Sequence, residues 1–371
     1  MNPVWPTRFE EQLLVAAFAP EQVSRNALAA CSAGDDETGK ALLPLVYRRW
    51  PTEPGRLIES GRLAYLATWR RSREQMDRLA AVGAFFEAHG IRWMALKGAA
   101  VILGGQAELG TRAMSDLDIL IEPKDVPNAA ALLEQNGYRA EEGAAVEAIV
   151  SQTRVRHAWQ FLAEPDANID LHWRPLSRCY APAVSQAFWE GAGRVSYQEH
   201  DMLVPSVSDQ LFHACVHGLQ WDWTRKVRWI ADALSLMRGA IDWERVARLA
   251  ESAILSCRLG KALAFLRERF EAAVPADLPG SLLRSAAHWE EREYEVLLKP
   301  CPLGFRDSLA WHAYHFRRIR PFDEGWRRMP VALAFPRYVA AFLDAADFGS
   351  WRRKLRPHFE ARMKRASERV S

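Results

Sequence analysis

The pattern of hydrophobic and polar positions divides the chain into three parts. Apolar residues recur at helical spacing in residues 8–18 and again in residues 63–86, which predicts helices there. The pattern changes at Gly90, a residue type favoured just after a helix, and short apolar runs follow. From Asp201 the helical pattern returns and continues to the end. We therefore expect an α/β core between two helical parts, divided as residues 1–88, 89–200 and 201–371.

The middle part has the order strand, helix, strand, helix and then a hairpin. Pro123 and Gly137 bracket the second helix in the order that helix starts and stops favour. The connector at residues 164–168 is rich in turn-forming residues, so it joins the last two strands as a hairpin. The predicted strands are residues 91–96, 117–121, 157–162 and 169–173, and the predicted helices are residues 99–103 and 123–136.

Two aspartates on the second strand are the first candidates for chemistry. Side chains alternate along a strand, so Asp116 and Asp118 face the same side while Leu117 and Ile119 face the core. Neighbouring carboxylates repel each other unless a cation lies between them. Mg²⁺ suits such a site because it binds carboxylates together with substrate phosphates. The alternative for this short motif is an ordinary surface strand.

A third aspartate strengthens the metal hypothesis. Asp170 lies between apolar residues on the last predicted strand of the core. If that strand is next to the first acidic strand, three carboxylates converge, as a two-metal phosphoryl-transfer site requires. We expect two Mg²⁺ ions, with Mn²⁺ as a substitute. One would hold a triphosphate and the other would activate an acceptor hydroxyl, and Asp170 would be the third ligand, the base or both.

Phosphate-binding candidates lie just before the acidic strand. Gly98 would let a phosphate approach the backbone at a helix start, and Lys97 would place a point charge on the β or γ phosphate. Arg112 would contact the same triphosphate or balance the carboxylates. The alternatives are an exposed lysine at a strand end for Lys97 and a structural ion pair for Arg112.

Further polar residues complete the candidate set. Ser115 and His172 are assigned to phosphate binding, although His172 could instead contact the acceptor or orient the neighbouring aspartate. His213 and His217 share a helix face, but the HExxH pattern is absent, so packing or a polar contact is preferred to zinc. Asp232 is expected either to pair with a nearby arginine or to contact a substrate.

Composition adds limits rather than a function. The 49 Lys and Arg against 46 Asp and Glu give a net charge of +3, too small to argue for nucleic acid. Residues 352–369 hold eight basic residues against two glutamates, which predicts a solvated helix end or tail, with a polyanion contact as the alternative. The five cysteines form no CxxC pair and predict free thiols. Without a signal peptide or membrane span, we expect a cytoplasmic protein.

Several motifs in order resemble the uncharacterised bacterial nucleotidyltransferase family of the polymerase-β-like superfamily. The resemblance covers roughly residues 60–260. The motifs are Leu96-Lys97-Gly98, Arg112-x-x-x-Asp116-x-Asp118, Gly137-Tyr138, Ile169-Asp170-Leu171-His172-Trp173, Asp209-x-x-x-His213-x-x-x-His217 and Arg228-Trp229-Ile230-Ala231-Asp232. In the wider superfamily a Gly-Ser or Gly-Gly step stands where this chain has Lys97-Gly98.

The resemblance implies a mixed-sheet nucleotidyltransferase fold and Mg²⁺-dependent transfer of a nucleoside monophosphate from an NTP such as ATP. It implies no particular acceptor, which could be a small molecule, a carbohydrate, a peptide or an RNA end. One alternative is a toxin-like or RNA-modifying enzyme, for which the basic tail is the support. The other is a non-catalytic nucleotide-binding or scaffold module. Convergence of the three carboxylates would favour an enzyme over the second alternative.

Overall fold

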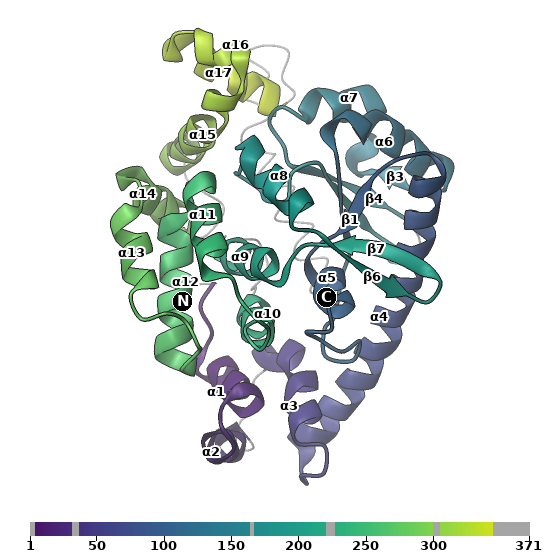
Figure 1. Ribbon diagram of the computed structural model, residues 1–371, viewed down its shortest axis with the longest axis vertical. Helices are drawn as coiled ribbons and strands as arrows, with labels where there is room; N and C mark the ends of the chain where they lie inside the picture. Colours follow the sequence, from purple (N-terminus) through teal and green to yellow (C-terminus); the bar gives the residue numbers. More distant parts are fainter. Residues whose placement is uncertain (1–3, 32–36, 164–166, 220–226, 300–304, 344–371) are drawn as a thin grey trace.

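The computed structural model describes residues 4–31, 37–163, 167–219, 227–299 and 305–343 (Figure 1). Its strands are β1 (Trp93–Ala95), β2 (Leu117–Ile121), β3 (Arg139–Ala140), β4 (Ala158–Leu162), β5 (Ile169–His172), β6 (Gly193–Tyr197) and β7 (His200–Val204). The helices before β6 are α1 (Arg8–Phe18), α2 (Glu21–Cys31), α3 (Leu43–Arg49), α4 (Arg56–Ala88), α5 (Lys97–Leu103), α6 (Val126–Gln135), α7 (Val146–Gln152) and α8 (Pro182–Glu190). The later helices are α9 (Val207–Gly218), α10 (Arg228–Leu236), α11 (Trp243–Ala253), α12 (Ser256–Phe270), α13 (Leu278–Ser285), α14 (His288–Leu297), α15 (Phe305–Ile319), α16 (Glu324–Arg328) and α17 (Val331–Phe342).

The centre of the fold is a five-stranded mixed sheet with the order β1-β2-β5-β4-β3. Strands β2 and β5 are parallel, and the other neighbouring pairs are antiparallel. The parallel register places Asp118 opposite Asp170 and Leu120 opposite His172. This confirms the predicted mixed-sheet fold and the predicted hairpin, which is the β4–β5 pair.

The two faces of the sheet pack against different sets of helices. Ile119 and its neighbours on one face share a core with Met76 and Phe86 of α4 and with Leu133 of α6. Leu120, on the other face, belongs to the core built by the helices that follow the sheet together with the N-terminal helices α1 to α3. Because strand side chains alternate, Asp118 lies on the same face as Leu120. The acidic positions are therefore enclosed between the sheet and the helical part of the protein.

The N-terminal residues contribute to both cores. The ring of Trp5 lies 4.6 Å from that of Phe265 and 6.0 Å from that of Trp229, so the first residues pack on α10 and α12. The second half of α4 instead packs under the sheet. Helix α1 begins with a capping box formed by Thr7 and Glu10. The division into three domains stays a prediction, with the first part shared between two cores.

The prediction of helix from Asp201 onward is wrong at its start. His200–Val204 forms β7, which pairs with β6 as an antiparallel hairpin. Met202 and Val204 are buried and alternate with more exposed residues, which is the period of a strand. A strand of five residues is too short to be distinguished from the helical pattern that follows it. The partner strand β6 carries mostly exposed residues, so it has no apolar run that predicts a strand.

The predictions for the cysteines, the hairpin connector and the basic tail can be compared with the structure only where it describes these residues. Four cysteines are free, as predicted, and all four are buried: Cys31, Cys179, Cys215 and Cys257. Cys301, residues 164–166 of the hairpin connector and the basic tail at residues 352–369 lie outside the described residues. Among the helices that the structure describes, none is long and apolar enough to cross a membrane.

The close approach of α4 to β1 gives a first test. A Cβ at Gly83 would lie 2.1 Å from Cζ2 of the buried Trp93, so Gly83→Ala forces this contact apart. We expect the free energy of unfolding to fall by about 1–3 kcal/mol, as for other overpacked cores. Gly280→Ala is the control, because the nearest atom there, at 3.2 Å, is the end of the flexible Arg284 side chain. Equal unfolding free energies for the two variants in urea titrations would contradict this packing.

Candidate active site

Lys97 is the first residue of α5, two residues after the end of β1, and it has an unusual backbone conformation. Its φ angle is 47°, in the left-handed region that residues other than glycine rarely adopt. Such strain persists where the surrounding structure imposes it, and it is concentrated at functional sites. The Lys97 ammonium forms an ion pair with Asp118 Oδ1 and lies 3.9 Å from Asp170 Oδ2. The start of α5 thus brings a cation to both carboxylates.

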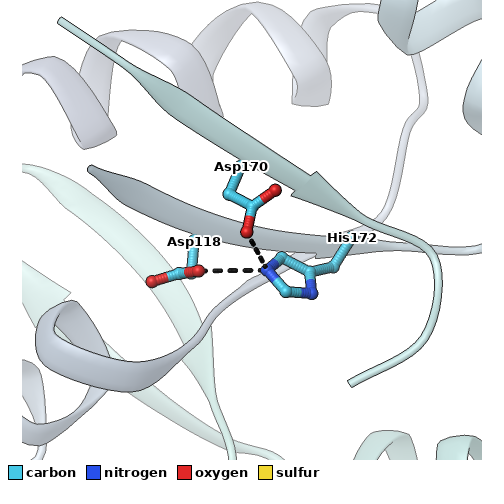
Figure 2. Close-up of side chains that lie close together, drawn as sticks. All are labelled: Asp118, Asp170 and His172. Carbon is cyan, nitrogen blue, oxygen red and sulfur yellow. Dashed lines mark hydrogen bonds and ion pairs between the residues drawn. The ribbon is translucent and has the colours of Figure 1, made fainter. Parts of the chain in front are cut away.

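Asp118, Asp170 and His172 form a compact group on the two parallel strands (Figure 2). His172 Nε2 lies 3.0 Å from Asp118 Oδ1 and 3.1 Å from Asp170 Oδ2. The other ring nitrogen, Nδ1, is directed away from the carboxylates and lies 3.3 Å from the carbonyl oxygen of Arg174. One ligand atom from each of the three residues lies within 4.8 Å of the others, a spacing that a shared metal ion would allow.

The electrostatics of the group keep both carboxylates ionised. Burial by itself would raise the pKa of Asp170, but His172 and Lys97 outweigh it and hold this pKa well below its usual value. The pKa of Asp118 is also lowered, because Lys97 and His172 together exceed the effect of burial. Burial opposes the charged form of His172, yet the two aspartates raise its pKa to about 9. The imidazolium therefore acts as a cation between two anions.

The residues present fit a divalent cation. Asp118 and Asp170 are held ionised against the single ammonium of Lys97, so the group keeps an excess of negative charge when His172 is neutral. A divalent ion would offset that excess. Carboxylate oxygens suit Mg²⁺ and Mn²⁺, and a neutral imidazole can add a nitrogen ligand to a transition-metal ion.

Asp116 lies at the edge of this group. Strand β2 begins at Leu117, so Asp116 precedes the strand and accepts a hydrogen bond from the Ser115 hydroxyl at 2.9 Å. Burial and the neighbouring Asp118 raise the pKa of Asp116. Among the described residues, the group with metal-ligand spacing contains Asp118, Asp170 and His172 but not Asp116. Its role as a ligand, and that of Ser115 toward phosphate, stay predictions.

Gly98 and Arg112 have structural partners. A Cβ at Gly98 would lie 2.8 Å from the Met114 side chain, so glycine allows the segment before β2 to pack on α5. Arg112 Nε lies 2.9 Å from Asp232 Oδ1, and both side chains are largely buried. For Arg112 and for Asp232 alike, the sequence left such an ion pair open as the structural alternative. Phosphate binding by Gly98 and Arg112 stays a prediction.

Two other histidines lie near the group. The ring of His157 is 5.3 Å from that of His172, and burial lowers its pKa. The β4–β5 register, which pairs Ala158 with His172, could have placed His157 here from the predicted hairpin. His213 on α9 is buried, and burial lowers its pKa to about 3. Its ring centre lies 5.6 Å from that of His217, and the preference for a packing or polar role over zinc stays a prediction.

The raised pKa of His172 predicts how stability depends on pH. In the unfolded chain a histidine has a pKa of about 6.5, so the stabilisation from protonated His172 is complete below that pH and is lost as pH rises through about 9. We expect the unfolding free energy of the metal-free protein to fall over this window and His172→Gln to flatten the fall. His288→Gln, at an exposed histidine, is the control. The same slope in wild type and His172→Gln would contradict the assignment.

Comparison with known proteins shows that the part of the chain containing the sheet and the site matches one protein family. A family model described as an uncharacterised nucleotidyltransferase matches residues 40–271. The match spans more than half of the chain and includes every strand and the whole Asp118, Asp170 and His172 group. No curated protein matches the chain. The chain therefore belongs to the uncharacterised nucleotidyltransferase family.

Proposed function

We propose that the protein transfers a nucleoside monophosphate from an NTP to a hydroxyl or phosphate of an acceptor, with Asp118 and Asp170 holding a divalent cation. The observation that carries this proposal is the register of the parallel strands, which sets the two carboxylates opposite each other and within reach of one imidazole. Membership of a nucleotidyltransferase family supports the reaction class. Burying these charges together costs desolvation energy and is a poor way to stabilise a fold, so it favours an enzyme over a scaffold module.

The proposed reaction is a displacement at the α-phosphorus. The acceptor oxygen forms a bond to the α-phosphorus, and the bond from that phosphorus to the oxygen bridging to the β-phosphate breaks. Pyrophosphate leaves with the bonding electron pair, and the acceptor proton passes to a carboxylate of the site or to solvent. A bound divalent cation would supply charge stabilisation to the phosphates and acidify the acceptor hydroxyl. We propose Mg²⁺, with Mn²⁺ as a substitute.

The residues of this chain then have distinct tasks. Asp118 and Asp170 hold the cation through their carboxylate oxygens, and His172 Nε2 either adds a nitrogen ligand or orients Asp170. Lys97 neutralises Asp118 in the structure. A cation bound to that carboxylate would release the ammonium to pair with the β or γ phosphate. Asp116, Ser115, Gly98 and Arg112 remain proposed contacts to the cation or the phosphates.

Replacing either central carboxylate tests the proposal. Asp118→Asn and Asp170→Asn keep the side-chain shape but remove the charge that holds the cation, so we expect transfer to fall by at least ~100-fold. The assay incubates each variant with labelled NTP, Mg²⁺ and an extract of the source cell, and follows labelled products by mass spectrometry. Asp201→Asn, at an exposed aspartate on β7, is the control. Transfer at the wild-type rate in both site variants would rule out this role.

The proposed task of Lys97 has its own test. Lys97→Gln removes the ammonium that is proposed to pair with the triphosphate. We expect the apparent KM for NTP to rise by roughly 10-fold, since a hydrogen bond to a charged group contributes about 1.5–3 kcal/mol. Lys261→Gln is the control, because Lys261 pairs with Glu291 on the helical part of the protein. An unchanged KM in Lys97→Gln would leave Lys97 as a partner of Asp118 alone.

A further inference from the structure

A pocket of about 710 Å³ lies at the end of the acidic strands, between the sheet, α8 and the 3₁₀ turn Arg320–Phe322. In Figure 1, α8 lies beside the sheet and below α15 to α17. The residues used below that line it are Arg92, Glu122, Arg154, Arg174, Tyr180 and Trp189. With charged and aromatic side chains around one cavity of this size, it has the make-up of a small-molecule site.

The pocket is adjacent to the carboxylate group. Glu122 directly follows the end of β2, which carries Asp118, and Arg174 lies two residues after the end of β5, which carries Asp170. His172 connects the two places, because Nε2 contacts the carboxylates while Nδ1 lies 3.3 Å from the Arg174 carbonyl oxygen. The pocket therefore adjoins the C-terminal ends of the two strands that carry the proposed reacting centre.

The pocket lies on the side of the carboxylates opposite the start of α5, which carries Lys97. Strand β1 is antiparallel to β2, with Ala95 opposite Ile119, so the chain beyond Ala95 runs toward the beginning of β2. The Leu96 amide accordingly donates to the Asp118 carbonyl at 2.9 Å. In phosphoryl transfer the entering and leaving oxygens are roughly in line on opposite sides of the phosphorus. With the triphosphate tail at Lys97, the pocket lies where an acceptor would enter.

Arg174 is the distinctive residue of this pocket. Its Nη1 donates to the carbonyl oxygens of Thr153 at 2.6 Å and Arg156 at 3.0 Å, and its guanidinium lies 4.8 Å from the centre of the Tyr180 ring. These contacts fix the orientation of the guanidinium but bring no negative charge. Within the described part of the chain, no carboxylate pairs with Arg174, and burial lowers its pKa. A largely buried cation without a counterion is unfavourable, and a bound anion would remove that cost.

Two other arginines of the pocket show the contrast. Arg154 is neutralised by Asp323, with Nε and Nη2 each 3.0 Å from a carboxylate oxygen. Arg92 is exposed, and its guanidinium lies 4.6 Å from the centre of the Trp189 ring. No described carboxylate forms an ion pair with Arg92 either. The pocket thus holds two guanidinium groups, each set against an aromatic ring and each lacking an anionic partner among the described residues. Its carboxylates at Glu122 and Glu190 contact Lys124 and Gln186 instead.

We propose that this pocket binds the acceptor and that Arg174, with Arg92, recognises a carboxylate or phosphate group on it. The proposal rests on the transfer reaction proposed above. The anionic group of the acceptor would take no part in bond making, and a separate hydroxyl of the acceptor would form the bond to the α-phosphorus as pyrophosphate leaves. Planar guanidinium groups suit both carboxylate and phosphate, because each offers paired donors to paired oxygens.

The test measures binding of three matched probes by isothermal titration calorimetry. The probes are glycerol, glycerate and glycerol 3-phosphate, which share hydroxyls and differ in having no anion, a carboxylate or a phosphate. Titrations use the full chain at constant ionic strength, with and without saturating Mg²⁺ and a non-hydrolysable ATP analogue that fills the nucleotide site. We expect wild type to bind one or both anionic probes and to bind glycerol at least ~10-fold more weakly. The stronger anionic probe identifies the group that the pocket recognises.

Variants assign the binding to the unpaired arginines. Arg174→Gln should weaken binding of the anionic probe by about 10-fold or more, because it removes a charged hydrogen-bond donor from the anion. Arg92→Gln, at an exposed position, should weaken binding of the anionic probe by a smaller factor. If Arg174→Gln does not fold, the loss of binding in Arg92→Gln is the test of the proposal. The double variant Arg154→Gln/Asp323→Asn is the control, because it removes a neutralised pair from the same pocket without changing its net charge.

Two results would overturn the proposal. One is equal binding of glycerol and both anionic probes by wild type, including no binding of any of them. The other is unchanged anion binding in folded Arg174→Gln and Arg92→Gln. Asp118→Asn separates this proposal from the transfer reaction, because it should abolish transfer and leave anion binding in the absence of nucleotide intact.

Discussion

The burial of Asp118 beside Asp170 is the constraint on which the rest of the site depends. Two ionised carboxylates on neighbouring strands are stable only when cations compensate them. The ammonium of Lys97 and the imidazolium of His172 do this in the structure. The left-handed conformation of Lys97 and the parallel pairing of β2 with β5 serve this arrangement, because they fix where the two cations and the two anions meet.

The same arrangement explains how the protein can respond to a divalent cation. His172 carries a proton because the two aspartates stabilise it, so a cation bound to those aspartates would displace that proton. Lys97 would lose its partner and become available to phosphate. The pocket around Arg174 adjoins the C-terminal ends of β2 and β5, and Arg174 has no carboxylate partner among the described residues. Two anions on β2 and β5 and a guanidinium just beyond β5 thus lie near one another in the fold.

Much of this fold could be predicted from the sequence because its signals are local. The β2 segment Leu117–Ile121 was predicted at its observed bounds, since an apolar run between polar residues marks a buried strand. The β6–β7 hairpin was missed because its strands are short and β6 is mostly exposed. Asp118 and Asp170 were predicted to meet, but that required β2 and β5 to be neighbours, which no local pattern states. The position of His172 between the carboxylates, the Arg112–Asp232 pair and the pocket depend on side-chain geometry between distant segments.

The central claim is that Asp118 and Asp170 together hold a divalent cation. The most direct measurement is a titration of the protein with Mn²⁺, following free and bound ion by electron paramagnetic resonance. The account predicts saturable binding to wild type that competes with Mg²⁺ and is lost in Asp118→Asn and Asp170→Asn, while Asp201→Asn binds as wild type does. Equal Mn²⁺ affinity and stoichiometry in wild type and in both site variants would contradict it.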